Sequence, residues 1–430
     1  MSIIYAVITV LLIHGASSLL SPSAIKGTLM GIPEDGLLNF TQMAVKYNKS
    51  AEEHQVTTED GYVLTLFRLP GDKGPVLMNH GVFDSADGWI LRGNNSLAIM
   101  LADAGYDVWL ANQRGCRYSR KHVSLNPDKD PEFWDYSAHE YGIYDLPANI
   151  DYILNATGQS QLIIIGFSEG TTATFILGST KPEYNAKIKS FVALAPIAFL
   201  QNASGPLKAL IHLGPLLNGL LPFFEISGFF SLSKAIINLI CTQLVIGYDF
   251  CFGVFFNPLI GPHFEAIDSS FFKVIIGHFP AGTSKKNLIH YSQIGIRSTF
   301  AAYDYGTLKN LEIYGAFVPP SYDLGKVTMK VVLVSGRNDK VSAIADVQIL
   351  RDKLPNVVDW NILEDPLYNH LDHLWAVDAH KVEYPYVIDM LANCFFFKHL
   401  YADDLQIIAI PKLMRSRMRS NRPCSEIQRL

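Results

Sequence analysis

Hydrophobic residues along this chain gather in short, β-branched runs, which alternate with longer stretches where apolar residues recur at helical spacing. A short apolar run bounded by Gly, Pro or Asn predicts a strand. Strands are predicted at 62–69, 75–81, 106–115, 161–167, 188–196, 329–336 and 356–363. Strands that alternate with helices predict an α/β fold with a mainly parallel sheet covered by helices.

The segments between these runs predict the helices. Apolar residues recur there at helical spacing, and the segments end near Gly, Pro or Asn. They are 95–105, 144–158, 168–182, 343–354 and 384–400. The alternation breaks at 199–320, which is rich in Phe, Ile and Leu. We interpret this break as an inserted, mostly helical cap and lid subdomain that divides an α/β core into 19–198 and 321–402.

A serine stands where one buried strand is predicted to end. The strand at 161–167 leads into Gly-Phe-Ser-Glu-Gly, and a helix with small residues follows at once. Gly-x-Ser-x-Gly between a strand and a helix is the pattern of a nucleophile elbow, a turn so tight that its flanking positions are glycine. The pattern predicts that Ser168 is a nucleophile. An ordinary strand end flanked by glycine is the alternative.

A serine nucleophile needs a base and a carboxylate that orients the base. In an α/β hydrolase these follow the serine in the order Asp or Glu, then His. Asp339 comes directly after the strand predicted at 329–336, which favours it as the carboxylate. Asp365 and Asp372 are rival carboxylates, but neither ends a strand in the same way.

Two histidines compete for the role of the base. His370 and His373 both lie in the loop after the strand at 356–363, and only one of them can meet the serine. His80 is a third histidine near a strand end, but it precedes the serine, which is the wrong order for this fold.

An acyl-transfer serine also needs N–H donors for the oxyanion. The N–H of the residue after the nucleophile is one donor, here that of Glu169. The second comes from the loop after an early strand. His80-Gly81 lets that loop turn inward, so the N–H of Val82 is the expected partner.

Composition limits the class of protein. Of the 430 residues, 49% are hydrophobic and 17% are charged, below the roughly 25% charged residues of soluble domains. Some apolar surface is therefore expected to stay exposed or to cover a greasy ligand. The net charge of −5 gives no reason to expect nucleic acid, and the basic tail at 403–430 is typical of a solvated end. Because no Cys/His cluster has metal-ligand spacing, no metal and no cofactor is expected.

The first residues have the pattern of a secretory signal peptide, predicted at 1–18. Ser2–Ile13 is apolar but too short for a hydrocarbon core of about 30 Å, and Ala16 and Ser18 are small residues before a cleavage point. A buried helix or an anchor is the alternative. Because no other long uncharged apolar window occurs, no transmembrane segment is expected. Secretion is favoured, with the lysosome left open.

Glycosylation and cysteine usage agree with that compartment. Five Asn-x-Ser/Thr sequons occur, none blocked by proline. They are at Asn39, Asn48, Asn94, Asn155 and Asn202. Cys241 and Cys251 enclose a short loop and are the expected disulfide. Cys116, Cys394 and Cys424 are widely separated, and each can be a free or buried thiol.

Motifs along nearly the whole chain resemble those of the acid lipase family, which includes lysosomal acid lipase and gastric lipase. The matching stretches include "NHGVFDSADGW", "GYDVWLANQRGCRYSRKH", "YDLPANIDYIL", "PAGTSKKNLIHYSQ", "GRNDKVSAIADVQIL" and "NHLDHLWAVDA". The resemblance implies an α/β hydrolase with a cap and lid that hydrolyses neutral lipid esters, triacylglycerol or cholesteryl ester, at a lipid–water interface. By motif it maps the triad onto Ser168, Asp339 and His370, and it gives the Cys241–Cys251 bridge a counterpart.

The elbow departs from the family pattern. Where the family reads Gly-His-Ser-Gln-Gly, this chain has Phe167 and Glu169. The Glu169 side chain brings a carboxylate close to the oxyanion site or points into solvent, and both alternatives stay open. In the insertion, Phe223, Phe224 and their neighbours Phe229 and Phe230 face the lipid through an opening lid or form an ordinary cap core.

Two other functions remain open from the sequence. A carboxylesterase for small soluble esters would use the same fold, but it needs no large Phe-rich insertion. A non-catalytic lipid-binding protein would be expected to lose the Ser/Asp/His set.

Overall fold

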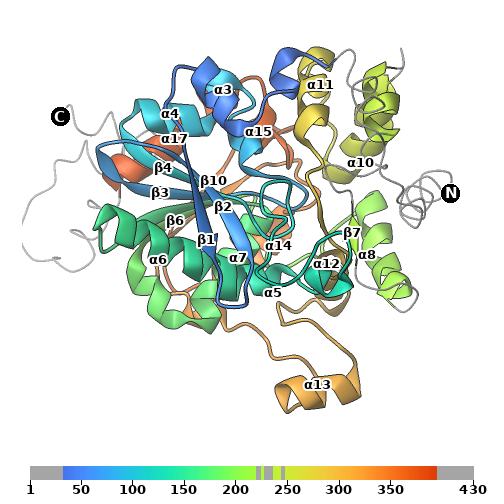
Figure 1. The fold of residues 1–430 in the computed structure, drawn as a ribbon. Coiled ribbons are helices and arrows are strands. Elements are labelled where there is room, and N and C mark those ends of the chain that lie inside the picture. The colour runs from blue at the N-terminus through green and yellow to red at the C-terminus, as the bar shows by residue number, and fades with distance from the viewer. Residues whose placement is uncertain (1–31, 219–223, 227–235, 244–246, 395–430) are drawn as a thin grey trace, which may run out of the picture.

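An eight-stranded sheet forms the centre of the protein in the computed structural model, which describes residues 32–218, 224–226, 236–243 and 247–394 (Figure 1). Its strands lie in the order β1-β2-β4-β3-β5-β6-β9-β10. In this order the six strands from β4 to β10 run parallel to one another. At one edge, β2 pairs antiparallel with β4, and β1 pairs antiparallel with β2. The bounds are β1 Glu52–Thr57, β2 Val63–Leu69, β3 Lys73–Asn79, β4 Tyr106–Ala111, β5 Leu162–Phe167, β6 Ile188–Leu194, β9 Val331–Ser335 and β10 Val357–Ile362.

The structure confirms the predicted α/β fold and its mainly parallel sheet. Each of the seven predicted strands corresponds to an observed one, with ends that differ by a few residues. The strand of the central sheet that is missing from the prediction is β1, with the sequence Glu-Glu-His-Gln-Val-Thr, where only Val56 is buried. A strand at a sheet edge needs few apolar residues, so its hydrophobic pattern is weak.

Helices cover both faces of the sheet (Figure 1). One face packs on α3 Phe40–Lys46, α4 Leu97–Asp103, α11 Ser269–His278, α15 Asp372–Trp375, α16 Ala379–Val382 and α17 Tyr384–Asp389. The other packs on α6 Leu146–Thr157, α7 Glu169–Thr180 and α14 Ile344–Lys353. Short helical turns complete the core: η2 Glu34–Gly36, η3 Ala86–Trp89, η4 Gly93–Asn95, η5 Pro131–Trp134, α5 Ala138–Glu140, η6 Tyr141–Asp145, η7 Pro182–Lys187, η10 Leu324–Lys326 and η11 Met390–Cys394. All five predicted helical segments contain a helix.

A long insertion leaves the sheet after β6 and returns to β9, although these two strands pair side by side. Its helices α8, α10, α11 and α12 lie toward the right of the body in Figure 1, with α11 in the core of one face and α12 in that of the other, and α13 projects away from the body. The bounds are α8 Gly205–Asn218, η8 Leu239–Gln243, η9 Asp249–Phe256, α10 Asn257–Ile260, α12 Lys285–Arg297 and α13 Thr307–Tyr314, with a small sheet of β7 Glu225–Ile226 and β8 Thr283–Ser284.

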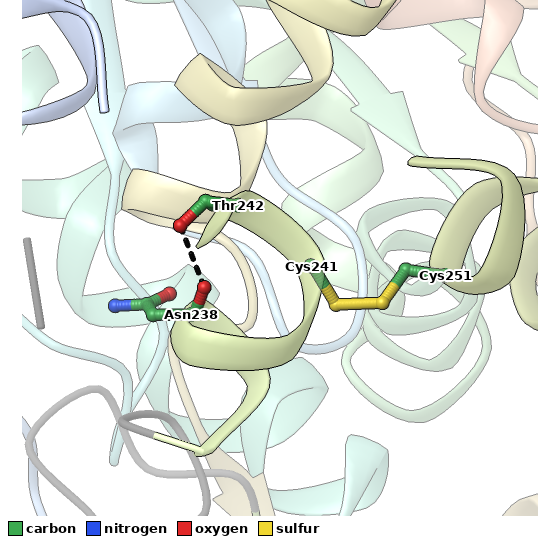
Figure 2. The surroundings of a disulfide bond; sticks show 4 residues. All are labelled: Asn238, Cys241, Thr242 and Cys251. Atoms are coloured by element: carbon green, nitrogen blue, oxygen red, sulfur yellow. Dashed lines mark hydrogen bonds between the residues drawn. A yellow bond between two sulfur atoms is a disulfide. The ribbon is translucent and has the colours of Figure 1, made fainter. Parts of the chain in front are cut away.

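A disulfide joins two short helices of the insertion. Figure 2 shows Cys241 on η8 bonded to Cys251 on η9, beside a hydrogen bond from the Thr242 hydroxyl to the Asn238 carbonyl oxygen. The bridge agrees with the pairing expected from the short loop. Cys116 is a free, buried thiol whose pKa burial raises to about 12. The side chain of Cys394, and all of Cys424, lie outside the described residues.

Candidate active site

The elbow is built at the end of β5. Ser168 adopts φ 52° and ψ −116°, a conformation that costs strain for a residue with a side chain. Its N–H donates to the carbonyl oxygen of Leu194 on the neighbouring strand at 3.1 Å. A Cβ at Gly166 would lie 2.9 Å from the backbone of Gly170, and one at Gly170 would lie 2.2 Å from the carbonyl oxygen of Asn79. Both flanking positions therefore require glycine because backbone occupies the space.

The Ser168 side chain lies in a line of two hydrogen bonds with His370 and Asp339. The Ser168 Oγ is 2.8 Å from the His370 Nε2, and the His370 Nδ1 is 2.8 Å from the Asp339 Oδ2. Because an ionised carboxylate only accepts hydrogen bonds, the proton of a neutral imidazole belongs on Nδ1. The Nε2 lone pair then faces the serine hydroxyl, which is the geometry of a general base.

The carboxylate of this line is held on both oxygens. Asp339 Oδ1 accepts the backbone N–H groups of Val341 at 2.8 Å and Ser342 at 2.7 Å, which leaves Oδ2 for the histidine. Ser168, His370 and Asp339 are 2%, 6% and 4% exposed, so water has little access to the three groups. A site shielded in this way strengthens each of these charge-assisted hydrogen bonds.

The rival residues have other partners. His373 is buried and its Nδ1 lies 2.7 Å from the Glu383 Oε1. Burial alone would lower the pKa of His373, but Glu383, Asp339 and Asp372 together raise it above its ordinary value. Asp372 Oδ2 lies 2.7 Å from the Nδ1 of His263, and Asp365 caps the N–H of Leu367. In the part of the chain that the structure describes, none of these groups forms a hydrogen bond with Ser168, so they are structural neighbours of the site.

The loop after β3 lies against the serine. A Cβ at Gly81 would come within 3.0 Å of the Phe167 ring and 3.1 Å of the Ser168 Cβ, so this glycine permits the close approach. His80 holds the loop in place: its Nδ1 donates to the Gly81 carbonyl oxygen at 2.8 Å, and its Nε2 accepts the Gln113 N–H at 3.1 Å. Burial lowers the pKa of His80 to about 4, which keeps this tautomer neutral. Val82 follows directly in the same loop.

Glu169 is buried at the first position of α7, so the solvated alternative is wrong. The residue is 1% exposed, and its Oε1 accepts a hydrogen bond from the Asn287 Nδ2 on α12 at 2.6 Å. Burial raises the pKa of Glu169 to about 7, although the hydrogen bond with Asn287 opposes the shift. The contact of Asn287 with Glu169 was not predicted from the sequence, because nothing in "KKNLIHY" indicates that this asparagine contacts a residue 118 positions away.

The predicted glycosylation sites lie at the surface. The five sequon asparagines are all exposed, but the Asn202 Nδ2 donates to the Oδ1 of buried Asp346 at 2.8 Å. The N-terminal run, the basic tail, Phe223, Phe229 and Phe230 lie outside the described residues.

In the part of the chain that the structure describes, no group of His, Cys, Asp and Glu could hold a metal ion. No helix there has the length and apolarity to cross a bilayer.

Comparison with known proteins identifies the class. The family model for the alpha/beta hydrolase fold matches residues 74–376, and the model for the partial alpha/beta-hydrolase lipase region matches residues 40–93. The fold and the hydrogen-bonded serine, histidine and aspartate agree with this result. The chain is therefore an enzyme of the α/β hydrolase class.

Curated relatives are similar over most of the chain. Lipase 1 of Drosophila melanogaster is 36% identical, over 84% of this chain and 81% of its own length. Gastric triacylglycerol lipase of Rattus norvegicus is 37% identical, over 84% and 93%. Lysosomal acid lipase/cholesteryl ester hydrolase of Homo sapiens is 35% identical, over 85% and 93%. The chain belongs to the acid lipase family.

Proposed function

We propose that this enzyme hydrolyses carboxylic ester bonds of neutral lipids, triacylglycerol or cholesteryl ester, through an acyl-enzyme on Ser168. The observation that carries the proposal is the unbroken line of hydrogen bonds from Ser168 through His370 to Asp339, both at 2.8 Å, in a member of a lipase family. The names of the relatives support the choice of lipid esters, because they include a triacylglycerol lipase and a cholesteryl ester hydrolase.

The first half of the reaction forms the acyl-enzyme. The Nε2 of His370 takes the Ser168 proton while Oγ bonds to the carbonyl carbon, and the carbonyl oxygen becomes an oxyanion. The N–H groups of Val82 and Glu169 donate to this oxyanion; the N–H of Glu169 has no acceptor within its own helix because it lies in the first turn. The ester C–O bond then breaks, and His370 gives its proton to the leaving alcohol.

The second half repeats these steps with water. His370 removes a proton from water, the hydroxide attacks the acyl carbon, and the bond to the Ser168 Oγ breaks as His370 returns the proton to Oγ. The fatty acid leaves. Throughout, the Asp339 carboxylate accepts the Nδ1–H of His370 and stabilises the imidazolium without taking its proton.

We further propose that the enzyme is secreted, with the lysosome as the alternative. The apolar run predicted to be a signal peptide at 1–18 and the exposed sequon asparagines support this location. A lid that presents apolar side chains to a lipid surface is proposed within the insertion, where Phe224 lies beside β7.

The test compares emulsified long-chain triacylglycerol and cholesteryl ester with a dissolved short-chain ester, using Ser168→Ala as the blank. Turnover of the emulsions that disappears in Ser168→Ala supports the proposal. Activity restricted to the dissolved ester favours a carboxylesterase. Lipid binding without turnover by the unaltered protein favours a non-catalytic carrier.

A further inference from the structure

One segment of the insertion contacts both loops that carry the acid and the base. The segment is 260–263, with the sequence Ile-Gly-Pro-His, which begins at the last residue of α10 and leads toward α11. On the side of the acid, the Asn338 Nδ2 donates to the Pro262 carbonyl oxygen at 2.8 Å and the Lys340 N–H to that of Ile260 at 3.2 Å. The two donors flank Asp339 in the sequence, so the segment holds this loop from both sides.

The same segment holds the loop of the base. The Asn369 Nδ2 donates to the Gly261 carbonyl oxygen at 2.7 Å, and the His370 N–H points to the Ile260 carbonyl oxygen at 3.5 Å. The fit is close, because a Cβ at Gly261 would lie 1.9 Å from the carbonyl oxygen of Asn338 and its φ of +112° is unfavourable for other residues. Hydrogen bonds to the main-chain carbonyl groups of this segment therefore place the two loops relative to each other.

His263 adds a charged contact to this arrangement. Its Nδ1 lies 2.7 Å from the Oδ2 of Asp372, two residues after His370, and the same oxygen accepts the Asn369 N–H at 2.7 Å. The Asp372 side chain is 0% exposed, whereas that of His263 is 11% exposed. The contact thus joins the insertion directly to the short turn that presents the base.

We propose that His263 is a positioning residue, which fastens the loop carrying His370 to the insertion through Asp372 and does so most strongly at acidic pH. This inference rests on the proposed function, because it concerns the geometry of the same Ser168–His370 pair. The carbonyl groups of the Ile-Gly-Pro-His segment hold the two loops at every pH, whereas the contact of the His263 imidazole with Asp372 changes with pH.

The charges around the imidazole set the direction of the response. Asp372 faces its Nδ1, Asp365 lies 3.8 Å from its Nε2, and Asp378 adds a more distant negative charge. The hydrogen bond with Asp372 raises the pKa of His263 above its ordinary value of 6.5. Burial raises the pKa of Asp372 and the bond with His263 opposes it; the nearby charges of Arg92 and His373 also act on this carboxylate.

The charged contact is therefore present between the raised pKa of Asp372 and the raised pKa of His263, and it is lost as the pH rises through the latter. Above that pKa the carboxylate still accepts a hydrogen bond from the neutral imidazole, but the attraction between the two opposite charges is gone. A glutamine in place of His263 can form a neutral bond at every pH, so the variant isolates the contribution of the charge.

The experiment measures kcat and KM of the full-length enzyme from about pH 4.5 to 8 for the unaltered chain, His263→Gln and the control His212→Gln, an exposed histidine of the same insertion. For His263→Gln we expect kcat about three- to tenfold lower below pH 6, an unchanged KM, and convergence with the unaltered chain near pH 8. His212→Gln should match the unaltered chain throughout. A ratio of kcat values that stays constant with pH, or stays at one, would overturn the proposal.

Two further variants complete the experiment. In the background of Asp372→Asn, His263→Gln should cause no further loss, since the contact is already gone; additive losses would contradict the proposal. If His263→Gln fails to fold, Asp365→Asn still tests it, because removal of this partly exposed charge must move the alkaline limb of kcat to lower pH. Activity that persists in Ser168→Ala would instead refute the proposed function itself.

Discussion

Glu169→Gln tests how the buried carboxyl group next to Ser168 affects stability. The change keeps the size of the side chain and leaves an oxygen that can accept the hydrogen bond from Asn287, which is 2.6 Å long in the structure. It removes the negative charge that the carboxyl group acquires at high pH. The variant therefore reports the cost of ionising a group that is 1% exposed.

The magnitude follows from the pKa. Burial raises the pKa of Glu169 from 4.5 to about 7, and each pKa unit corresponds to about 1.4 kcal/mol. Because the folded-state pKa lies above the unfolded one, the folded state binds more protons, and stability falls as the pH rises from 4.5 to about 7. Above about pH 7 the full cost of ionising the buried carboxyl group, roughly 3 kcal/mol, is subtracted from the free energy of unfolding. Glu169→Gln should equal the unaltered chain near pH 4.5 and exceed its stability by this amount at pH 8.

The assay is thermal unfolding of both proteins between about pH 4.5 and 8. A difference of roughly 3 kcal/mol corresponds to about 4 °C in Tm for a chain of this size. Glu183→Gln, an exposed carboxylate in η7, is the matched control and should leave Tm unchanged at every pH. A Tm difference between Glu169→Gln and the unaltered chain that does not vary with pH would refute the reasoning.

The same variant should change the pH profile of kcat/KM. Below pH 7 the Glu169 carboxyl group is mostly neutral, so the acid limb of the profile should be the same in both proteins. Above pH 7 the carboxylate opposes the oxyanion at the N-terminus of the same helix, so Glu169→Gln should retain more activity there. Parallel curves would show that the carboxylate has no influence on the reaction.

Three other predictions concern packing, the rival histidine and glycosylation. Gly170→Ala should destabilise the fold by about 2 kcal/mol or more, measured by thermal unfolding, because its Cβ would lie 2.2 Å from a backbone oxygen; an unchanged Tm would contradict the close packing of the elbow. His370→Ala should abolish turnover in a folded protein, whereas His373→Ala should mainly lower Tm, since it leaves the fully buried Glu383 without its imidazole partner, a loss of about 3 kcal/mol; loss of turnover in a stable His373→Ala would reverse the assignment. Mass spectrometry of secreted protein should find no glycan on Asn202, whose amide nitrogen donates to buried Asp346; full occupancy there would contradict that contact.

Local patterns predicted the elements of the core and the residues that end its strands. The runs around Ser168 and Asp339 are almost wholly apolar, and such runs at a parallel sheet leave little choice of secondary structure. The order serine, aspartate, histidine along the chain then predicted which side chains would lie close together, and the structure brings all three within hydrogen-bond distance.

Features that depend on contacts between distant segments could not be predicted in this way. Whether Glu169 would be buried depended on α12, which lies more than a hundred residues away and supplies Asn287. The family motif selected His370 over His373, but the physical reason could not be predicted, because His373 is held by Glu383, which the sequence pattern does not connect with either histidine. The contact of His263 with Asp372 joins the insertion to the core across 109 positions. Polarity alone gives no sign of such partners, because their effect arises from burial in the folded chain.

The central claim is that Ser168 is the nucleophile and that His370 activates it. The most direct measurement is the stoichiometry and position of covalent labelling by a long-chain alkyl fluorophosphonate, read by peptide mass spectrometry on the folded, full-length enzyme. We expect one phosphonyl group per chain on Ser168, in step with loss of ester hydrolysis, and very slow labelling in His370→Ala. Labelling of another serine, or labelling of Ser168 that proceeds equally fast without His370, would contradict it.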